Sequence, residues 1–149
     1  MNINKNMRSL TFAIDFDGTC VTDSFPYVGD EIGATPVLRE LVGNGHRLIL
    51  CTMRCDHDFE PNISDERITN ISGEFLYAAI QWFKERKIPL YGIQKDPYQE
   101  EWTSSPKCFA DYIIDDRCLG IPLTDSVYGV KHVDWNRVRQ ILVEKKILK

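Results

Sequence analysis

Two aspartates separated by one residue follow a short apolar run near the start of the chain. Asp15 and Asp17 come directly after residues 10–14, whose sequence Leu-Thr-Phe-Ala-Ile predicts a buried strand. Residues i and i+2 of a strand point the same way, and Gly18 lets the backbone bend so that both carboxylates face one point. Like charges held this close repel unless a cation or a proton lies between them. The spacing therefore predicts a cation site at the end of a strand.

Further polar side chains stand at the ends of later apolar runs. Thr52 ends the second run and is soon followed by Arg54, while Asp115 and Asp116 end the fourth, with Lys107 in the loop before it. Taken singly, each of these residues could be a cap or a surface charge. Ligands of parallel sheets bind outside the carboxyl ends of the strands, where all these run ends would meet. Their shared position predicts one crevice in which carboxylates, a hydroxyl and cations converge.

The elements that must position these residues alternate along the chain. We expect four strands at residues 10–16, 47–52, 90–94 and 111–116, and a short fifth around 126–131. We expect helices from Thr35 to Gly43, over residues 73–87, and from an N-cap at Asp134 onward. Such alternation predicts an α/β fold, a Rossmann-like three-layer sandwich around a mainly parallel sheet of about five strands. We expect residues 1–149 to form a single domain.

Composition limits the classes of function. Of the 149 residues, 43% are hydrophobic and 27% charged, as in ordinary soluble domains, and the net charge of −4 provides no general attraction to nucleic acid or anionic membranes. The five cysteines are scattered, which favours reduced thiols over disulfides and makes a zinc site improbable. We see no signal peptide and no apolar stretch near the roughly 20 residues that span a bilayer. These observations predict a cytoplasmic protein without a membrane partner.

The motifs and their order resemble those of the haloacid dehalogenase (HAD) superfamily of phosphohydrolases. The first motif is matched by the run from Asp15 to Thr19, and the second by Thr52. The third is a lysine ahead of the fourth strand, matched by Lys107, and the fourth is the acidic pair that follows that strand. The four motifs lie in the family's order and extend from residue 8 to about 120. The family often spaces the acids of its fourth motif further apart, which leaves the role of Asp116 open.

The resemblance implies a Mg²⁺-dependent phosphomonoester hydrolase that works through an aspartyl-phosphate intermediate. Asp15 would be the nucleophile and, with Asp115, a direct metal ligand. Asp17 would contribute its backbone carbonyl to the metal and its carboxyl group as general acid and base. Asp116 would act on the metal through a bound water or orient a neighbour.

The resemblance also assigns groups to the substrate. Lys107 would neutralise charge on the nucleophile and the phosphoryl group, and Thr52 would hold a phosphoryl oxygen. The backbone N–H groups of Asp17 and Gly18 would do the same. Arg54 follows Thr52 closely and is a candidate contact to substrate.

Loop lengths suggest a member without a cap domain. The connections at residues 20–34 and 95–106, where relatives carry caps, are too short to contain one. Capless relatives act on bulky substrates or close the site by forming oligomers, so a homo-oligomer is possible. The acidic connection at residues 53–71 would repel a polyanion, which counts against nucleic-acid ends as substrate. We therefore expect a small phosphorylated metabolite, with the role of that connection left open.

The sequence is compatible with three alternatives. The protein could be a phosphatase of nucleic-acid ends or phosphoproteins, a phospho-responsive signalling module that does not hydrolyse, or a silent binding protein. Receiver-type signalling modules place their phosphoacceptor aspartate after the third strand, where this chain has Gln94 and Lys95. The presence of Asp17 counts against a silent binder, because binding alone needs no acid or base. The order of the motifs therefore favours the hydrolase.

Overall fold

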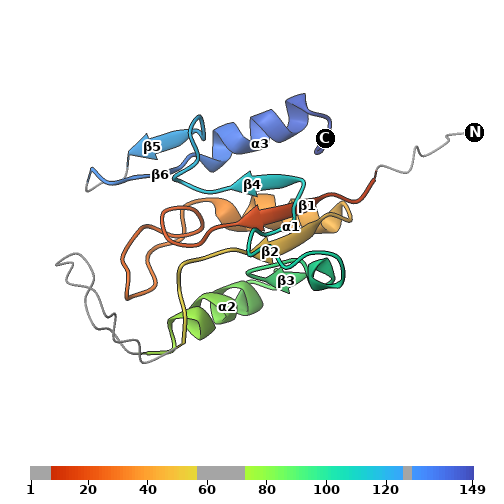
Figure 1. Cartoon of the computed structure of the whole chain (residues 1–149). Helices are drawn as coiled ribbons and strands as arrows, with labels where there is room; N and C mark the ends of the chain where they lie inside the picture. The colour runs from red at the N-terminus through yellow and green to blue at the C-terminus, as the bar shows by residue number, and fades with distance from the viewer. Residues whose placement is uncertain (1–7, 57–72, 126–128) are drawn as a thin grey trace, which may run out of the picture.

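The central sheet has four parallel strands, with β1 inside it. The computed structural model describes residues 8–56, 73–125 and 129–149. Within these ranges the sheet has the order β3-β2-β1-β4 (Figure 1), formed by β1 (Thr11–Ile14), β2 (Arg47–Leu50), β3 (Gly92–Ile93) and β4 (Tyr112–Ile114). The α/β fold with a parallel sheet, predicted from the alternation of elements, is confirmed. Because β2 and β4 flank β1, the residues that follow these three strands open onto the same edge.

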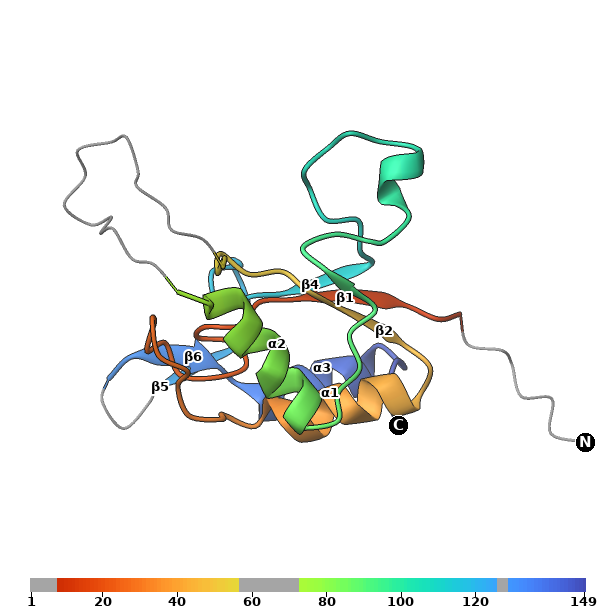
Figure 2. The same cartoon turned by 90° about the horizontal axis from the view of Figure 1, so that it is seen from below.

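Three helices cover one face of this sheet. They are α1 (Ala34–Gly43), α2 (Phe75–Glu85) and α3 (Trp135–Glu144). Figure 2 shows all three on the same side of the strands, with the 3-10 helix η1 (Gln99–Glu101) on the other side. No helix in the described part of the chain is long and apolar enough to cross a bilayer.

The core fills the space between the strands and these helices. Phe12 and Ile14 of β1 lie opposite Leu48 and Leu50 of β2, and all four side chains are fully buried. They belong to one apolar cluster with residues of all three helices, among them Leu38, Leu41, Phe83, Val138 and Leu142. Burial of these side chains, at about 1.5–3 kcal/mol each, holds the strand ends rigid beneath the site.

The connection from β3 to β4 crosses the opposite face for a topological reason. The chain moves from β1 to β2 to β3 in one direction across the sheet. It then returns past β2 and β1 to β4, on the other side of β1. Because crossovers between parallel strands are right-handed, reversing the direction moves the connection to the other face. Within the described ranges this connection contains only η1. The predicted three-layer sandwich therefore has a loop layer where a second layer of helices was expected.

Gln99 holds this connection in place. Its buried side chain accepts hydrogen bonds from the backbone N–H groups of Asp96 and Phe109, each at 3.0 Å. Its amide donates to the carbonyls of Ser105 at 3.2 Å and Lys107 at 3.0 Å. Both ends of a buried amide are thus satisfied, as burial requires. The same bonds determine where Lys107 lies.

The chain after β4 forms a separate hairpin instead of a fifth strand in the main sheet. β5 (Leu123–Asp125) and β6 (Lys131–Val133) pair antiparallel with each other. The predicted strand at 126–131 lies partly outside the described residues, and its last residue belongs to β6. The Val133 N–H donates to the Gly18 carbonyl at 3.0 Å, which attaches the hairpin to the loop after β1. A segment held by this bond does not extend the main sheet as a fifth strand.

The helix starts show one confirmed cap and one correction. Asp134 caps α3 as predicted, since its carboxylate accepts from the Arg137 N–H at 3.1 Å. In α1 the predicted cap Thr35 is already within the helix. Glu31 performs that role instead, because its carboxylate accepts from the N–H groups of Gly33 at 2.9 Å and Thr35 at 2.8 Å. The carboxylate also interacts favourably with the positive end of the helix dipole.

Candidate functional site

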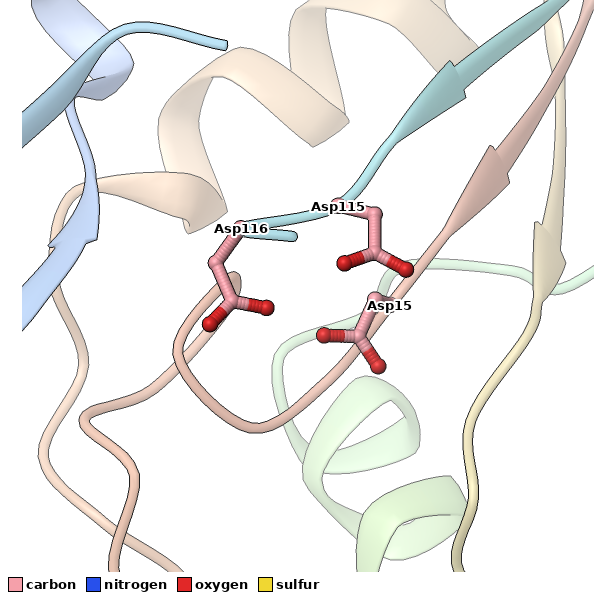
Figure 3. A group of neighbouring side chains, drawn as sticks. All are labelled: Asp15, Asp115 and Asp116. Atoms are coloured by element: carbon pink, nitrogen blue, oxygen red, sulfur yellow. The ribbon is translucent and has the colours of Figure 1, made fainter. Parts of the chain in front are cut away.

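Three carboxylates meet where β1 and β4 end. Asp15 follows β1, and Asp115 and Asp116 follow β4; one oxygen from each lies within 4.8 Å of the others. Figure 3 shows the three side chains directed toward a common space. The strands bring them together because they pair in parallel and the pairing extends to the Asp15 N–H, which donates to the Ile114 carbonyl at 3.0 Å. The predicted convergence of these acids is present in the structure.

The cluster is unfavourable without a proton or a cation. Burial, together with the charges of Asp115 and Asp116, raises the pKa of Asp15 to about 7, against the lowering effect of hydrogen bonds from the Phe16 N–H and Thr19. Burial also raises the pKa of Asp116, and the charge of Asp115 adds to this. Three hard oxygen donors in one place suit Mg²⁺ or Ca²⁺. The donor set therefore fits the divalent ion that the motif resemblance implies.

Thr19 joins the two loops that carry these acids. Its hydroxyl donates to Asp15 Oδ2 at 2.9 Å and accepts from the Asp116 N–H at 3.1 Å. Its carbonyl accepts from the indole N–H of Trp135 at 2.6 Å, which links the loop to α3. Thr19 is fully buried, so it organises the carboxylates and is not exposed to a ligand. Thr19 belongs to the first motif, and its type and position in the sequence predicted no separate role for it.

Gly18 allows Asp116 to approach the loop after β1. Its φ of +77° lies in the left-handed region, and a Cβ there would be 2.5 Å from Asp116 Oδ2. Its N–H, predicted to hold a phosphoryl oxygen, donates to the Val21 carbonyl at 2.8 Å. The structure thus assigns that N–H to the turn, which removes it from the predicted phosphoryl donors.

Replacing Gly18 by alanine should damage the acidic cluster specifically. Gly120 is a matched control, because its φ is +88° and a Cβ there would meet nothing within 4 Å. Both alanine variants should lose about 1 kcal/mol of stability from the strained backbone. Only Gly18→Ala should also weaken Mg²⁺ binding, measured by calorimetry, because Asp116 must move. Equal Mg²⁺ affinity in the two variants would contradict this prediction.

Asp17 and the buried side chain of Arg54 form an ion pair. Arg54 donates from Nε to Asp17 Oδ2 and from Nη2 to Asp17 Oδ1, each at 2.7 Å. The Asp17 carboxylate thus points to Arg54 and stands apart from the three-carboxylate cluster. Its predicted role on the metal therefore concerns its backbone carbonyl alone. Arg54 was predicted to contact substrate, and the sequence contained no sign of its pairing with Asp17.

Thr52 is fixed by a residue that the sequence reasoning did not assign to the site. Gln94, just after β3, accepts from the Thr52 N–H at 3.0 Å and donates to the Thr52 carbonyl at 2.6 Å. The Thr52 hydroxyl accepts from the Arg54 N–H at 3.2 Å, so its own proton can be donated elsewhere. The position of Gln94 at a strand end was the signal that could have identified it.

These residues surround one cavity of about 440 Å³. Its walls include most of the predicted site: Asp15, Asp17, Thr52, Arg54, Asp115 and Asp116. Asp23, Phe25, Met53 and Arg117 complete them. Arg117 was not predicted, although it directly follows the acidic pair and its N–H donates to Asp115 Oδ1 at 2.8 Å. The connection at residues 53–71, whose role was left open, lies mostly outside the described residues.

Gly18 does not line this cavity, and Lys107 is the predicted site residue that lies away from it. It is exposed and lines another cavity of about 320 Å³, together with Trp102 and Phe109. The hydrogen bond from Gln99 to the Lys107 carbonyl holds its backbone in the layer on the far face of the sheet. Its predicted contact with the nucleophile would require this connection to move.

The cysteines are free thiols. All five lie in the described residues, and none forms a disulfide. Burial and contact with the Cys108 thiol raise the pKa of Cys51, which lies beside the site after β2. A raised pKa keeps Cys51 protonated and makes it a poor nucleophile. Cys51 is therefore a poor candidate for a nucleophile of this cavity.

Comparison with known proteins identifies a relative of the same fold. A conserved protein from Bacteroides thetaiotaomicron has a solved structure that superposes on this chain with a TM-score of 0.65. The two are 32% identical in sequence, and the match covers 93% of each chain. No protein-family model and no curated protein sequence matches the chain.

Proposed function

We propose that this chain, which belongs to the same family as the conserved Bacteroides thetaiotaomicron protein, is a Mg²⁺-dependent phosphomonoester hydrolase of the HAD type. One observation carries the proposal. Asp15 lies within 4.8 Å of Asp115 and Asp116 by their carboxylate oxygens and shares its cavity with Asp17. The groups proposed as nucleophile, acid–base group and cation ligands thereby stand together in the motif order of that superfamily.

The metal would be held by Asp15, Asp115 and Asp116, with the Asp17 carbonyl as a further ligand. Its chemical contribution is positive charge that lets an anionic nucleophile approach an anionic phosphoryl group. The raised pKa of Asp15 supports this assignment, because a bound cation would replace the proton that the cluster otherwise retains.

Two displacements at phosphorus account for hydrolysis. A carboxylate oxygen of Asp15 forms a bond to phosphorus while the ester P–O bond breaks, and the Asp17 carboxylic acid protonates the departing oxygen. Water then attacks phosphorus of the aspartyl phosphate and gives a proton to the Asp17 carboxylate. The P–O bond to Asp15 breaks, which releases inorganic phosphate and restores the Asp15 carboxylate and the Asp17 acid.

Thr52 would hold a phosphoryl oxygen during both steps. Its hydroxyl already accepts from Arg54, and its free proton can be donated into the cavity. Gln94 holds the backbone of Thr52 from both sides, so the donor is oriented before substrate arrives. Preorganised donors of this kind stabilise the charge that develops on the transferring group.

The proposed substrate is a small phosphorylated metabolite. A cavity of about 440 Å³ lies within the range of small-ligand sites. Asp23 also lines a neighbouring cavity of about 470 Å³, between residues 22–32 and the β5–β6 hairpin, which provides room for a leaving group. Four acidic residues and one lysine line it, and this excess of negative charge would repel polyanionic leaving groups such as nucleic-acid ends.

Release of phosphate from an aryl phosphate with Mg²⁺ tests the proposal. Wild type should turn over, and Asp17→Asn should lose about 10²- to 10⁴-fold in kcat because it has neither acid nor base. Stable phosphorylation without turnover in wild type would instead indicate a signalling module. A preference for phosphorylated oligonucleotides or phosphopeptides would indicate the other class of phosphatase. No reaction with any phosphoester in a broad panel would indicate a binding protein.

The cation that serves the phosphoryl group can be identified by two matched substitutions. Arg117 lines the cavity of the carboxylates, whereas Lys107 lines a different one. Arg117→Met should therefore lower kcat/KM by about 10-fold or more, and Lys107→Met by less than about 3-fold, since only the former charge acts at close range. The reverse order would show that the β3–β4 connection moves to bring Lys107 to the substrate.

A further inference from the structure

The side chain of Arg54 donates hydrogen bonds to other groups of the protein. The Nε and Nη2 groups of its guanidinium, which form a planar fork, donate hydrogen bonds of 2.7 Å to the two oxygens of Asp17. Arg binds carboxylates most tightly in this geometry. The side chain of Arg54 is only 1% exposed, whereas that of Asp17 is 18% exposed. The open side of this pair is therefore the carboxylate, and the guanidinium lies behind it.

The remaining surface of the guanidinium is enclosed. Nη2 also donates to the Tyr27 carbonyl at 2.8 Å, and Nη1 to the carbonyl of Phe75, the first residue of α2, at 3.4 Å. The guanidinium carbon lies 5.0 Å from the ring centre of Phe16 and 5.3 Å from that of Phe25. Arg54 cannot turn to a substrate without breaking the Asp17 pair and leaving these contacts.

We propose that Arg54 is a positioning residue that acts on the reaction through Asp17 and does not bind substrate. This proposal rests on the proposed function, because it concerns the acid–base group of that reaction. An ionised carboxylate has about four lone-pair sites, and the fork occupies two of them. The other lone-pair sites remain available for the proton that Asp17 donates and accepts. The two hydrogen bonds from Arg54 fix the plane of the Asp17 carboxylate and so the direction of these sites.

Three segments far apart in sequence determine this geometry. Arg54 follows β2, Tyr27 belongs to the connection after β1, and Phe75 begins α2. The rings of Phe25 and Phe75 meet edge to face at 5.2 Å beside the guanidinium. The orientation of Asp17 therefore depends on how the connection after β1 packs against α2.

A double-mutant cycle on kcat distinguishes positioning from substrate binding. Arg54→Lys keeps a cation but loses the planar fork, and it should lower kcat by about 30-fold or more. Because Arg54 acts through Asp17, Arg54→Lys should change kcat of Asp17→Asn by less than about 3-fold. The inhibition constant of inorganic phosphate should also stay within about 3-fold of wild type. The proposal would be overturned if the effects of the two substitutions on kcat multiplied in the double mutant. It would also be overturned if Arg54→Lys raised the inhibition constant of phosphate about 10-fold.

Leaving-group dependence provides a second readout that simple loss of structure does not imitate. An alkyl phosphate needs protonation of its departing oxygen, whereas a nitrophenyl phosphate needs it far less. The first-turnover release of nitrophenol measures phosphoryl transfer to the enzyme before the aspartyl phosphate is hydrolysed. Arg54→Lys should therefore lower the rate on the alkyl ester at least about 10-fold more than it lowers the rate of this nitrophenol release. Equal losses on both substrates would contradict positioning of the acid.

A matched control and a direct probe complete the test. Arg139 donates to Glu40 through the same fork, with two bonds of 2.8 Å, between α3 and α1. Arg139→Lys should leave the kinetics unchanged. The ¹³C resonance of the Asp17 carboxyl carbon should shift in Arg54→Lys whether or not the protein turns over. An unshifted resonance would overturn the positioning claim, while a shifted one in a protein without phosphatase activity would refute only the proposed function.

Discussion

Replacing Asp15 by asparagine is expected to abolish turnover. Asparagine has nearly the same size but offers no carboxylate to attack phosphorus, so kcat should fall by about 10⁴-fold or more. The protein should also fail to acquire a phosphoryl group, which intact-protein mass spectrometry after an acid quench would detect in wild type. The substitution therefore tests the nucleophile separately from the acid–base group, because Asp17→Asn should still become phosphorylated by an aryl phosphate.

Asp30→Asn is the control for this experiment. Asp30 is an exposed aspartate in the connection after β1 that lines the neighbouring cavity and not the cavity of the carboxylates. It should retain the wild-type kcat and the phosphorylation of Asp15; only KM can change, since Asp30 lines the cavity proposed to receive the leaving group. If Asp15→Asn kept more than about a tenth of the wild-type kcat, Asp15 would not be the nucleophile and the site would activate water directly.

The second large effect concerns stability without metal. The pKa of Asp15 is raised to about 7, well above the value near 4 that applies in the unfolded chain. The folded state therefore binds the proton more tightly than the unfolded state. The stability that this proton contributes is present below about pH 4 and is lost as the pH rises through about 7. The loss amounts to at most about 4 kcal/mol at pH 8.

Mg²⁺ should restore this stability at high pH. At about pH 8 the ion can bind the ionised cluster, and a concentration 100-fold above its dissociation constant adds about 2.7 kcal/mol to the free energy of unfolding. At about pH 5 the proton competes with the ion, so the gain should be smaller. Urea unfolding at the two pH values, in Mg²⁺ or in a chelator, measures both effects.

Asp15→Asn separates the carboxyl group from the rest of the protein in this measurement. Without metal, the variant should be more stable than wild type at pH 8 and close to it at pH 4, because asparagine carries no charge to repel Asp115 and Asp116. Asp30→Asn should follow wild type throughout. A pH-independent difference between wild type and Asp15→Asn, or equal stabilisation of both by Mg²⁺, would count against the carboxylate cluster as the ion site.

Local sequence was sufficient for much of the fold and for the core of the candidate site. Apolar runs of strand length predicted the four strands of the sheet. The inner strand β1 is buried throughout, whereas Tyr112 and Ile113 of β4 and Ile93 of β3 are exposed at the sheet edges. Asp15, Asp115 and Asp116 could be placed together from the end of their strands alone. Parallel pairing puts consecutive strand ends on one edge, so this part of the geometry follows from topology.

The sequence could not predict features that depend on loop paths and long-range contacts. Lys107 stands at the spacing of the third motif, yet a hydrogen bond from Gln99 to its carbonyl holds its backbone in the layer on the far face. The expected fifth strand gave way to a hairpin attached to Gly18 by one backbone hydrogen bond. Neither outcome has a signature in composition or periodicity.

The sequence by itself determined which acids stand at the ends of β1 and β4, because strand periodicity and chain order are local properties. Tertiary structure alone decided how those groups are oriented. The pairing of Arg54 with Asp17 and the bridge from Thr19 to the Asp116 backbone join residues 37 and 97 positions apart. Such contacts form only after the sheet and its helices have packed, since a buried fork or hydroxyl bonds to whichever partner the packed core places within reach.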